Sequence, residues 1–301
     1  MDPKIYSNLE EISGPFKGIL LDAYGVFWGG GGVGQLPGSR EAMKRLVAAG
    51  KIVGVLSNAT RLVYDEIEKL KAHGFFQGEH FHFFITSGEL MKELFSRGEF
   101  PFSVSTKKFY LFGEQNSKLA FHRAIFNNTF YEETDNLLEA DFIYISVPQI
   151  GGEDQTDREV FRKQVESLLH AKIPMVCGNP DLFAHEGNPP RMVVRQGSIA
   201  ALYEELGGEV FYIGKPSTKM YFAAMEKFTQ YQITNTKDVI MVGDTPETDI
   251  RGAKRSGIAS ALVVKTGIMA ERIGHHGWEE ALKILSSDDI PEFFIQQMGE
   301  I

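Results

Sequence analysis

The sequence has little cysteine, no excess of basic residues and no long apolar run. Cys177 is the single cysteine in 301 residues, which excludes an internal disulfide framework and fits a reducing compartment. No stretch approaches the roughly 18 apolar residues of a membrane-spanning helix, and no secretory-signal layout is present. The formal net charge of −9 provides no basic surface for nucleic acid. We therefore expect a cytoplasmic protein that binds neither nucleic acid nor membranes.

What the sequence does contain is an alternation of apolar strands and amphipathic helices. Strands are expected at 17–23 and 51–56, with helices at 39–49 and 61–72, and the alternation continues along the chain. Such a pattern is typical of a parallel sheet with helices on both faces. The length favours two domains. The sequence therefore predicts an α/β fold on a doubly wound parallel sheet, preceded by a lead-in with a short helix around 5–12.

Four of the expected strands end in residues that carry chemistry. In a doubly wound sheet the carboxyl ends of the strands converge on one crevice, so these residues are expected to lie together. An isolated aspartate after an apolar strand is more often a turn residue, and only the combination of four such ends indicates a site. The residues are Asp22 after the first strand, Ser57 and Asn58 after the second, Lys215 after a strand at 209–213, and Asp244 with Asp249 after a strand at 239–242.

The residue types at these strand ends fit a metal ion and a phosphate group. Asp22 and Asp244 can share a hard cation such as Mg²⁺, which prefers oxygen ligands and keeps water or substrate phosphate in its remaining positions. The hydroxyl of Ser57, the amide of Asn58 and the ammonium group of Lys215 suit phosphate oxygens. Together these residues could hold a hard cation and phosphate oxygens around one point.

The same residues, in the same order, resemble the four motifs of the haloacid dehalogenase superfamily. The motifs are Asp22-x-x-Gly25-Val26, Leu56-Ser57-Asn58, Gly214-Lys215-Pro216 and Gly243-Asp244-x-x-x-Thr248-Asp249. Two further strings are similar to the class IIA branch, which contains p-nitrophenylphosphatase-like, sugar-phosphate and pyridoxal-phosphate phosphatases. These strings are Leu36-Pro37-Gly38 and Gly178-Asn179-Pro180-Asp181. The first motif, Asp-Ala-Tyr-Gly, is atypical.

This resemblance implies a Rossmann-like core with an inserted α/β cap domain. The core would comprise residues 1–86 and 209–301, and the cap, which would select the substrate, residues 87–208. Caps of this kind often dimerise in the family, so a homo-oligomer is a further expectation. The implied partner is a small phosphorylated metabolite, such as a sugar phosphate or a similar phosphomonoester.

The resemblance also assigns a role to the acidic residues. Asp22 would be the nucleophile and would form an aspartyl-phosphate, which splits one difficult displacement into two easier ones. The carboxylates of Asp22 and Asp244 and the backbone carbonyl of Tyr24 would ligate Mg²⁺. Asp249 would support the metal indirectly, by orienting its ligands.

The remaining motif residues would hold the substrate. Ser57 and Lys215 would hold the transferred phosphoryl group and offset the charge that develops on its oxygens, with Asn58 beside them. Asn179 and Asp181 would lie on the cap side, near the leaving group of the substrate.

Tyr24 departs from the superfamily pattern. Phosphatases of the superfamily carry a second aspartate at this position, which protonates the leaving group and then activates water. Losing such an acid/base costs about 10²–10⁴ in rate. A phenol, with a reference pKa of about 10, is a poor replacement at neutral pH. Tyr24 therefore occupies a catalytic position, and slow turnover is expected.

Two alternatives stay open at the level of sequence. The Asp-Ala-Tyr-Gly string is similar to the first motif of the haloacid dehalogenases themselves, which displace halide through an aspartyl ester and need no metal. A metal-independent 2-haloacid dehalogenase would, however, have no evident use for Asp244 and Asp249. The second alternative is a catalytically weakened protein that binds a phosphorylated metabolite.

Overall fold

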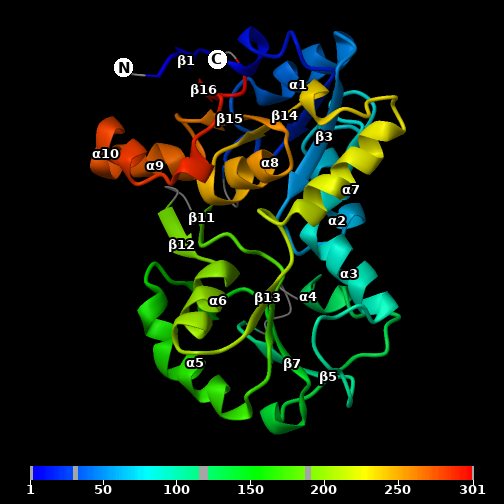
Figure 1. The fold of residues 1–301 in the computed structure, drawn as a ribbon, viewed down its shortest axis with the longest axis vertical. Coiled ribbons are helices and arrows are strands. Elements are labelled where there is room, and N and C mark those ends of the chain that lie inside the picture. Colours follow the sequence, from blue (N-terminus) through cyan, green and yellow to red (C-terminus); the bar gives the residue numbers. More distant parts are fainter. Residues whose placement is uncertain (1–2, 30–32, 115–120, 187–190, 300–301) are drawn as a thin grey trace.

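The computed structural model describes residues 3–29, 33–114, 121–186 and 191–299. These residues form two α/β units that lie one above the other along the long axis of the molecule, each around its own sheet (Figure 1). The α/β fold class predicted from the alternation of strands and helices is confirmed. Within this part of the chain, no helix has both the length and the apolar composition needed to cross a bilayer.

The larger sheet has seven strands, and every neighbouring pair is parallel. Its central strands are continuous apolar runs because helices cover both faces. In spatial order the strands are β1 (Ile5–Tyr6), β16 (Phe293–Ile295), β15 (Ala259–Val263), β14 (Val239–Gly243), β2 (Gly18–Leu21), β3 (Ile52–Ser57) and β4 (Phe83–Thr86).

The order of these strands reverses between β2 and β14. The chain moves outward from β2 through β3 and β4 on one side, and later from β14 through β15 and β16 on the other. Leu21 at the end of β2 pairs with Val242 of β14, so the loops after these strands leave the sheet at adjacent points. Open α/β sheets bind their ligands at such a reversal, outside the carboxyl ends of the strands.

Helices cover both faces of the larger sheet, because successive residues of a strand point to opposite faces. Leu21 belongs to a buried cluster with Met43 and Leu70, whereas Leu20 belongs to another with Phe228. The helices on the first face are α1 (Ser39–Ala48) and α2 (Val63–Lys71). Those on the second face are α7 (Thr218–Thr229) and α8 (Arg251–Arg255). Beside β15 lie α9 (Gly267–His276) and α10 (Trp278–Lys283).

The smaller unit has five parallel strands with its own helices. Two hairpins, β8–β9 and β11–β12, lie outside this sheet. In spatial order the sheet strands are β13 (Val210–Tyr212), β10 (Met175–Cys177), β7 (Phe142–Ile145), β5 (Lys108–Phe112) and β6 (Glu132–Glu133). The hairpin strands are β8 (Gln149–Ile150), β9 (Glu153–Asp154), β11 (Phe183–Glu186) and β12 (Arg191–Val194). The helices are α3 (Ser87–Arg97), α4 (Phe121–Ala124), α5 (Arg162–Leu168) and α6 (Gln196–Glu205).

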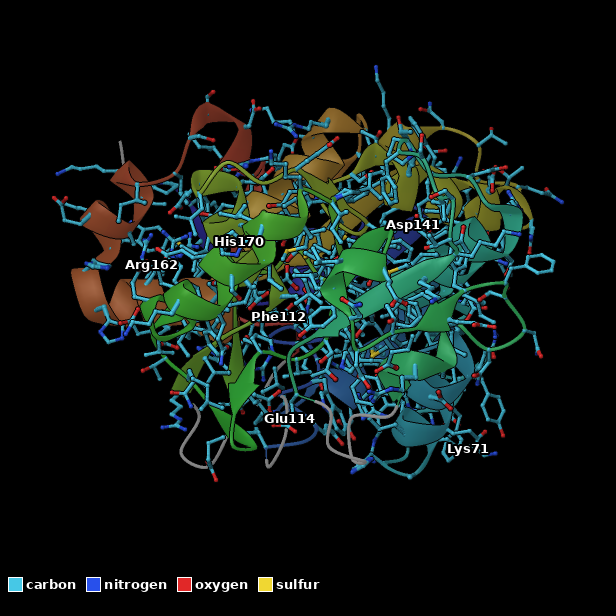
Figure 2. The ribbon with its side chains drawn as sticks, turned by 90° about the horizontal axis from the view of Figure 1, so that it is seen from below. Lys71, Phe112, Glu114, Asp141, Arg162 and His170 are labelled. Carbon is cyan, nitrogen blue, oxygen red and sulfur yellow. The ribbon has the colours of Figure 1, made fainter. Side chains whose placement is uncertain are left out.

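One carboxylate fixes the chain where it enters β5. Asp141, labelled in Figure 2, accepts hydrogen bonds from the backbone N–H groups of Ser105, Thr106 and Lys107 at 2.6–3.2 Å. Asp141 immediately precedes β7, which pairs with β5. These bonds therefore hold the two neighbouring strands at a common starting point.

Two sequence-based expectations were wrong. The expected N-terminal helix is replaced by β1, which pairs with β16, and by a short 3₁₀ helix, Leu9–Glu11, capped by the side chain of Asn8. The strand expected at 209–213 exists as β13, but it pairs with β10 in the smaller sheet rather than joining the larger one. An apolar strand has the same pattern in either sheet, so the sequence did not distinguish them.

Phe95, Phe126 and Phe142 belong to one buried cluster of the smaller unit, and we expect this cluster to contribute strongly to the stability of that unit. Phe95 of α3 is 1% exposed, and its ring lies 4.6 Å from Phe126 and 5.7 Å from Phe142, centroid to centroid. We expect Phe95→Ala to lower the free energy of unfolding by about 3–5 kcal/mol, measured by denaturant titration. Phe130→Ala is the matched control because Phe130 is 73% exposed, and a loss above about 1 kcal/mol there would contradict this account.

Candidate active site

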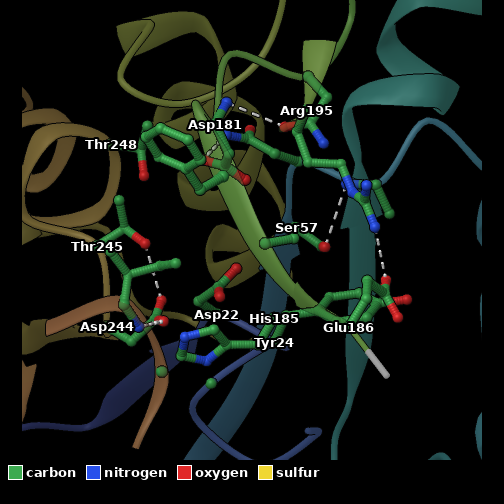
Figure 3. Close-up of a pocket in the computed structure, with 18 of the residues that line it drawn as sticks. Asp22, Tyr24, Ser57, Asp181, His185, Glu186, Arg195, Asp244, Thr245 and Thr248 are labelled. Carbon is green, nitrogen blue, oxygen red and sulfur yellow. Dashed lines mark hydrogen bonds and ion pairs between the residues drawn. The ribbon is translucent and has the colours of Figure 1, made fainter. Parts of the chain in front are cut away.

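A cavity of about 480 Å³ lies at the carboxyl ends of the central strands and is lined by residues of both units. All nine residues that the sequence singled out line it, although their roles remain predictions. They are Asp22, Tyr24, Ser57, Asn58, Asn179, Asp181, Lys215, Asp244 and Asp249. Figure 3 shows Asp22, Ser57 and Asp244 facing this cavity.

Lys215 forms the centre of the buried charges. Its Nζ atom lies 2.5 Å from Oδ1 of Asp22 and 2.7 Å from Oδ1 of Asp249, and its side chain is 1% exposed. Burial by itself would lower the pKa of Lys215, but the carboxylates of Asp22 and Asp249 outweigh it and raise that pKa well above its usual value. Lys215 is therefore a permanent cation at this point.

The position of Lys215 depends on Asn58 rather than on a strand of the larger sheet. Asn58 Oδ1 accepts a hydrogen bond from the backbone N–H of Lys215 at 2.7 Å, and Asn58 Nδ2 donates to the carbonyl of Lys215 at 3.2 Å. Lys215 lies on the connection that returns from β13 to α7. The expectation that it follows a strand of the larger sheet was wrong, because β13 pairs in the smaller one.

The loop after β14 holds the other two carboxylates. Asp249 lies in a wide helical turn, Pro246–Ile250, and its Oδ2 accepts from the backbone N–H groups of Asp244 and Thr245, both at 3.1 Å. Asp244 Oδ2 accepts from the N–H of Ile268 at 2.7 Å, and its Oδ1 accepts from the Thr245 hydroxyl at 3.0 Å. Both oxygens of Asp249 thus carry hydrogen bonds, which suits an orienting role.

Three carboxylates form a group that could hold a metal ion. One oxygen from each of Asp22, Asp244 and Asp249 lies within 4.8 Å of the others. Burial raises the pKa of Asp22 well above its usual range, opposed by Lys215, and burial with the Asp249 charge raises the pKa of Asp244 to about 7. A further cation would stabilise both ionised groups, and all-oxygen donors suit a hard divalent ion. The residues present therefore fit a metal site.

Two glycines make room for the Asp244 carboxylate. A Cβ atom on Gly25 would lie 2.2 Å from Asp244 Oδ2, and one on Gly267 would lie 1.9 Å from it. Both glycines have positive φ, of 82° and 71°. The backbone therefore approaches Asp244 from two sides, at distances that no side chain allows.

The side chain of Tyr24 is directed to a different group. Its hydroxyl accepts a hydrogen bond from Lys69 Nζ at 2.8 Å, and Lys69 also donates to Glu66 Oε2 at 2.6 Å. Burial raises the pKa of Tyr24, and the Glu66 charge raises it further, although Lys69 opposes both effects. The phenol therefore stays protonated at neutral pH, which argues against Tyr24 as a base.

The polar residues of the smaller unit meet the larger unit through Asn58. Asp181 Oδ1 accepts from Asn58 Nδ2 at 2.9 Å, and Asn179 Oδ1 accepts from the backbone N–H of Asp181 at 3.0 Å. Ser57 is buried beside them, and its Oγ accepts from the N–H of Ala59 at 3.2 Å. Asp181 is thus held against the same amide that positions Lys215.

Sequence reasoning missed the side chains on the outer wall of this cavity. Arg195, 8% exposed, donates to Asp154 Oδ1 and lies against Glu186 Oε1, each at 3.0 Å. Arg61 lies 3.8 Å above the ring of Phe121. The missed residues also include His122 and His185. Arg61 follows the Ser57 motif closely and could have been suspected, whereas no sequence pattern indicates that Arg195, His122 or His185 faces the cavity.

Comparisons with known proteins agree with this geometry. A family model described as haloacid dehalogenase-like hydrolase matches residues 19–126, and one described as HAD-hydrolase-like matches residues 212–287. Chronophin of Rattus norvegicus is 26% identical over 314 residues, covering 97% of this chain and 89% of chronophin. The 4-nitrophenylphosphatase of Schizosaccharomyces pombe is 24% identical, covering 99% of this chain and 96% of that protein.

The fold is also found among solved structures. A haloacid dehalogenase-like family hydrolase from Brucella suis 1330 superposes with a TM-score of 0.78 at 20% identity, covering 98% of this chain and all of that one. Fold and cavity together define an α/β hydrolase with an acidic site at the reversal of its larger sheet. The chain belongs to the haloacid dehalogenase superfamily, as the four sequence motifs indicated.

The close approach of Gly267 to Asp244 predicts a specific loss of metal binding. In Gly267→Ala the new Cβ would displace the Asp244 carboxylate, so we expect Mg²⁺ affinity, measured by calorimetry, to fall at least about tenfold. Gly274→Ala in the same helix is the control, since a Cβ there meets no atom within 4 Å. Equal Mg²⁺ affinity in the two variants would contradict the assigned site.

The raised pKa of Asp244 predicts a pH-dependent stability in the metal-free protein. Its folded pKa of about 7 exceeds the usual 3.8, so the folded state binds more protons. Asp244 therefore contributes instability that grows as the pH rises from about 4 to about 7. We expect the Tm of the metal-free protein to fall between about pH 5 and pH 7.5, and Asp244→Asn to reduce this fall by at least about 2 °C in a thermal melt. An identical fall in both proteins would disprove the assignment.

Proposed function

We propose that this protein is a Mg²⁺-dependent phosphatase that hydrolyses a small phosphorylated metabolite through an aspartyl-phosphate on Asp22. The observation that carries the proposal is the contact of a buried Asp22 with Lys215, beside Asp244, at the reversal of the larger sheet. A cavity of about 480 Å³ is of the size that accommodates a small metabolite. The name of the similar 4-nitrophenylphosphatase supports a phosphate ester as substrate.

The chain's own residues divide the chemistry between them. Asp22 attacks phosphorus, and the developing charge on the equatorial oxygens is offset by Lys215 and by the Ser57 hydroxyl. Mg²⁺ held by Asp22, Asp244 and the backbone carbonyl of Tyr24 would supply further charge neutralisation. Lys215 already contacts Asp22, so the nucleophile is held where its target would be bound.

We infer that the smaller unit is the cap that selects the substrate. It would extend from residue 87 to about 213, which moves the predicted boundary of 208 so that β13 is included. Asn179 and Asp181 would contact the leaving group from this side, because both belong to the smaller unit and line the cavity. The mixture of cationic and anionic groups on the outer wall, with Arg61, Arg195 and Glu186, suits a polar leaving group rather than an apolar one.

The proposal predicts that turnover requires both Asp22 and a divalent cation. A panel of phosphate esters with Mg²⁺ should show hydrolysis by the unmodified protein, and Asp22→Asn should lower kcat/KM at least about 10³-fold because the attacking carboxylate is gone. Asp135→Asn, an exposed aspartate of the smaller unit, is the control. EDTA should abolish the activity.

Two outcomes of that experiment would favour the alternatives. Turnover of a 2-haloacid in EDTA would replace the phosphatase by a metal-independent dehalogenase. Binding of phosphate esters without turnover would instead indicate the weakened binding protein. The acidic group of Asp22, Asp244 and Asp249 favours the metal-dependent reaction over both.

A further inference from the structure

The β11–β12 hairpin of the smaller unit contacts α9 of the larger unit. At this contact Nε2 of His185 on β11 is hydrogen-bonded to Oε2 of Glu271 on α9. His185 also lines the active-site cavity, and Figure 3 shows its imidazole on the same side as Asp22 and Asp244. The Nε2 atom of His185 is occupied by its hydrogen bond to Glu271, and no described residue forms a hydrogen bond with the Nδ1 atom of His185. Nδ1 is therefore the ring nitrogen that is available to a bound substrate.

Within the described residues, the other acidic groups of the cavity that could move a proton to the leaving group are already engaged. A group whose hydroxyl or carboxylate is bound to a fixed cation or amide is poorly placed to give a proton to substrate and recover it. The engaged pairs are Tyr24 and Glu66 with Lys69, Asp181 with Asn58, and Asp154 and Glu186 with Arg195.

The second imidazole of the cavity wall is equally unsuited. His122 is 1% exposed, and its Nδ1 lies 3.2 Å from the hydroxyl of Thr60. Burial lowers the pKa of His122 to about 3, with Arg61 adding to the effect. His122 is therefore neutral at physiological pH and has no extra proton to donate.

We propose that His185, oriented by Glu271, is the general acid and base of the hydrolysis, in the place of the aspartate that Tyr24 replaces. The inference rests on the proposed phosphatase function. A carboxylate bound to one imidazole nitrogen fixes the orientation of the ring, which leaves the other nitrogen to exchange a proton with substrate. His185 is the catalytic residue of this pair and Glu271 the positioning residue.

Both half-reactions balance with these groups. In the first, a bond forms between Asp22 and phosphorus while the bond to the leaving oxygen breaks, and that oxygen takes the proton from Nδ1 of His185. In the second, water attacks phosphorus and gives its proton to Nδ1, and the electrons of the breaking bond return to the Asp22 carboxylate. The sum is an alcohol and inorganic phosphate from a monoester and water.

The test compares a poor and a good leaving group, because only the poor one needs an acid. In His185→Gln we expect kcat/KM, which reports the first half-reaction, to fall about 10²-fold or more with glycerol phosphate and less than about 10-fold with 4-nitrophenyl phosphate. The second half-reaction then lacks its base, so 4-nitrophenyl phosphate should give a burst of about one nitrophenolate per protein. Glu271→Gln should also lose more activity with glycerol phosphate than with 4-nitrophenyl phosphate, but the loss should be smaller than in His185→Gln. We expect this loss to appear in kcat rather than in KM.

His275→Gln is the matched control. His275 approaches the other oxygen of Glu271 at 3.5 Å from the solvent side, is 66% exposed and does not line the cavity. We expect its kcat/KM to stay within about twofold for both substrates. The burst of about one nitrophenolate per protein also shows that the His185→Gln protein is folded, because a misfolded protein would not form the aspartyl-phosphate.

The possible failures are distinguishable. Equal losses of His185→Gln on both substrates, or no loss on either, would overturn the role of His185 while leaving the phosphatase intact. If Tyr24→Phe, rather than His185→Gln, loses more activity with the poor leaving group, the phenol of Tyr24 is the proton donor. That result would also overturn the role of His185. If the unmodified protein hydrolyses neither ester, the proposed function fails and this inference fails with it.

Discussion

The ammonium group of Lys215, placed between Asp22 and Asp249, is the interaction on which the rest of the site depends. A buried charge is tolerated only when it is paired and hydrogen-bonded, and this cation is 1% exposed. Lys215 fixes one oxygen of Asp22 and one of Asp249, and the second oxygen of Asp249 fixes the backbone of Asp244. The three carboxylates thus share one arrangement around a single lysine.

One amide links this charged centre to the smaller unit. Asn58, which follows β3 of the larger sheet, holds both the N–H and the carbonyl of Lys215 and also donates to Asp181. The return connection, the polar loop after β10 and the larger sheet therefore meet at one side chain. Because an amide both donates and accepts, a carboxylate or a hydrophobic residue at this position would leave some of these partners unsatisfied.

The larger sheet and the centre of the site could be predicted because their signals are local. Apolar runs that end in Asp22 or Asp244 mark buried strands whose ends carry chemistry, and that information lies within a few residues. The sheet to which β13 belongs could not be predicted, because the apolar pattern of one strand does not indicate which strand it pairs with. The contact of His185 with Glu271 joins residues 86 positions apart that stand in no motif, so only the fold reveals it.

The pairing of β1 with β16 brings the first and the last strands of the chain together at one edge of the larger sheet. Asp22 lies near the start of the chain, whereas Asp244 and the backbone groups that hold it come from the last third. Asp22 and Asp244 are therefore separated by the whole smaller unit in sequence, and contacts of such long range form slowly. A chain still emerging from the ribosome carries Asp22 before Asp244 exists, so the two carboxylates can meet only after the residues up to Asp244 have been synthesised.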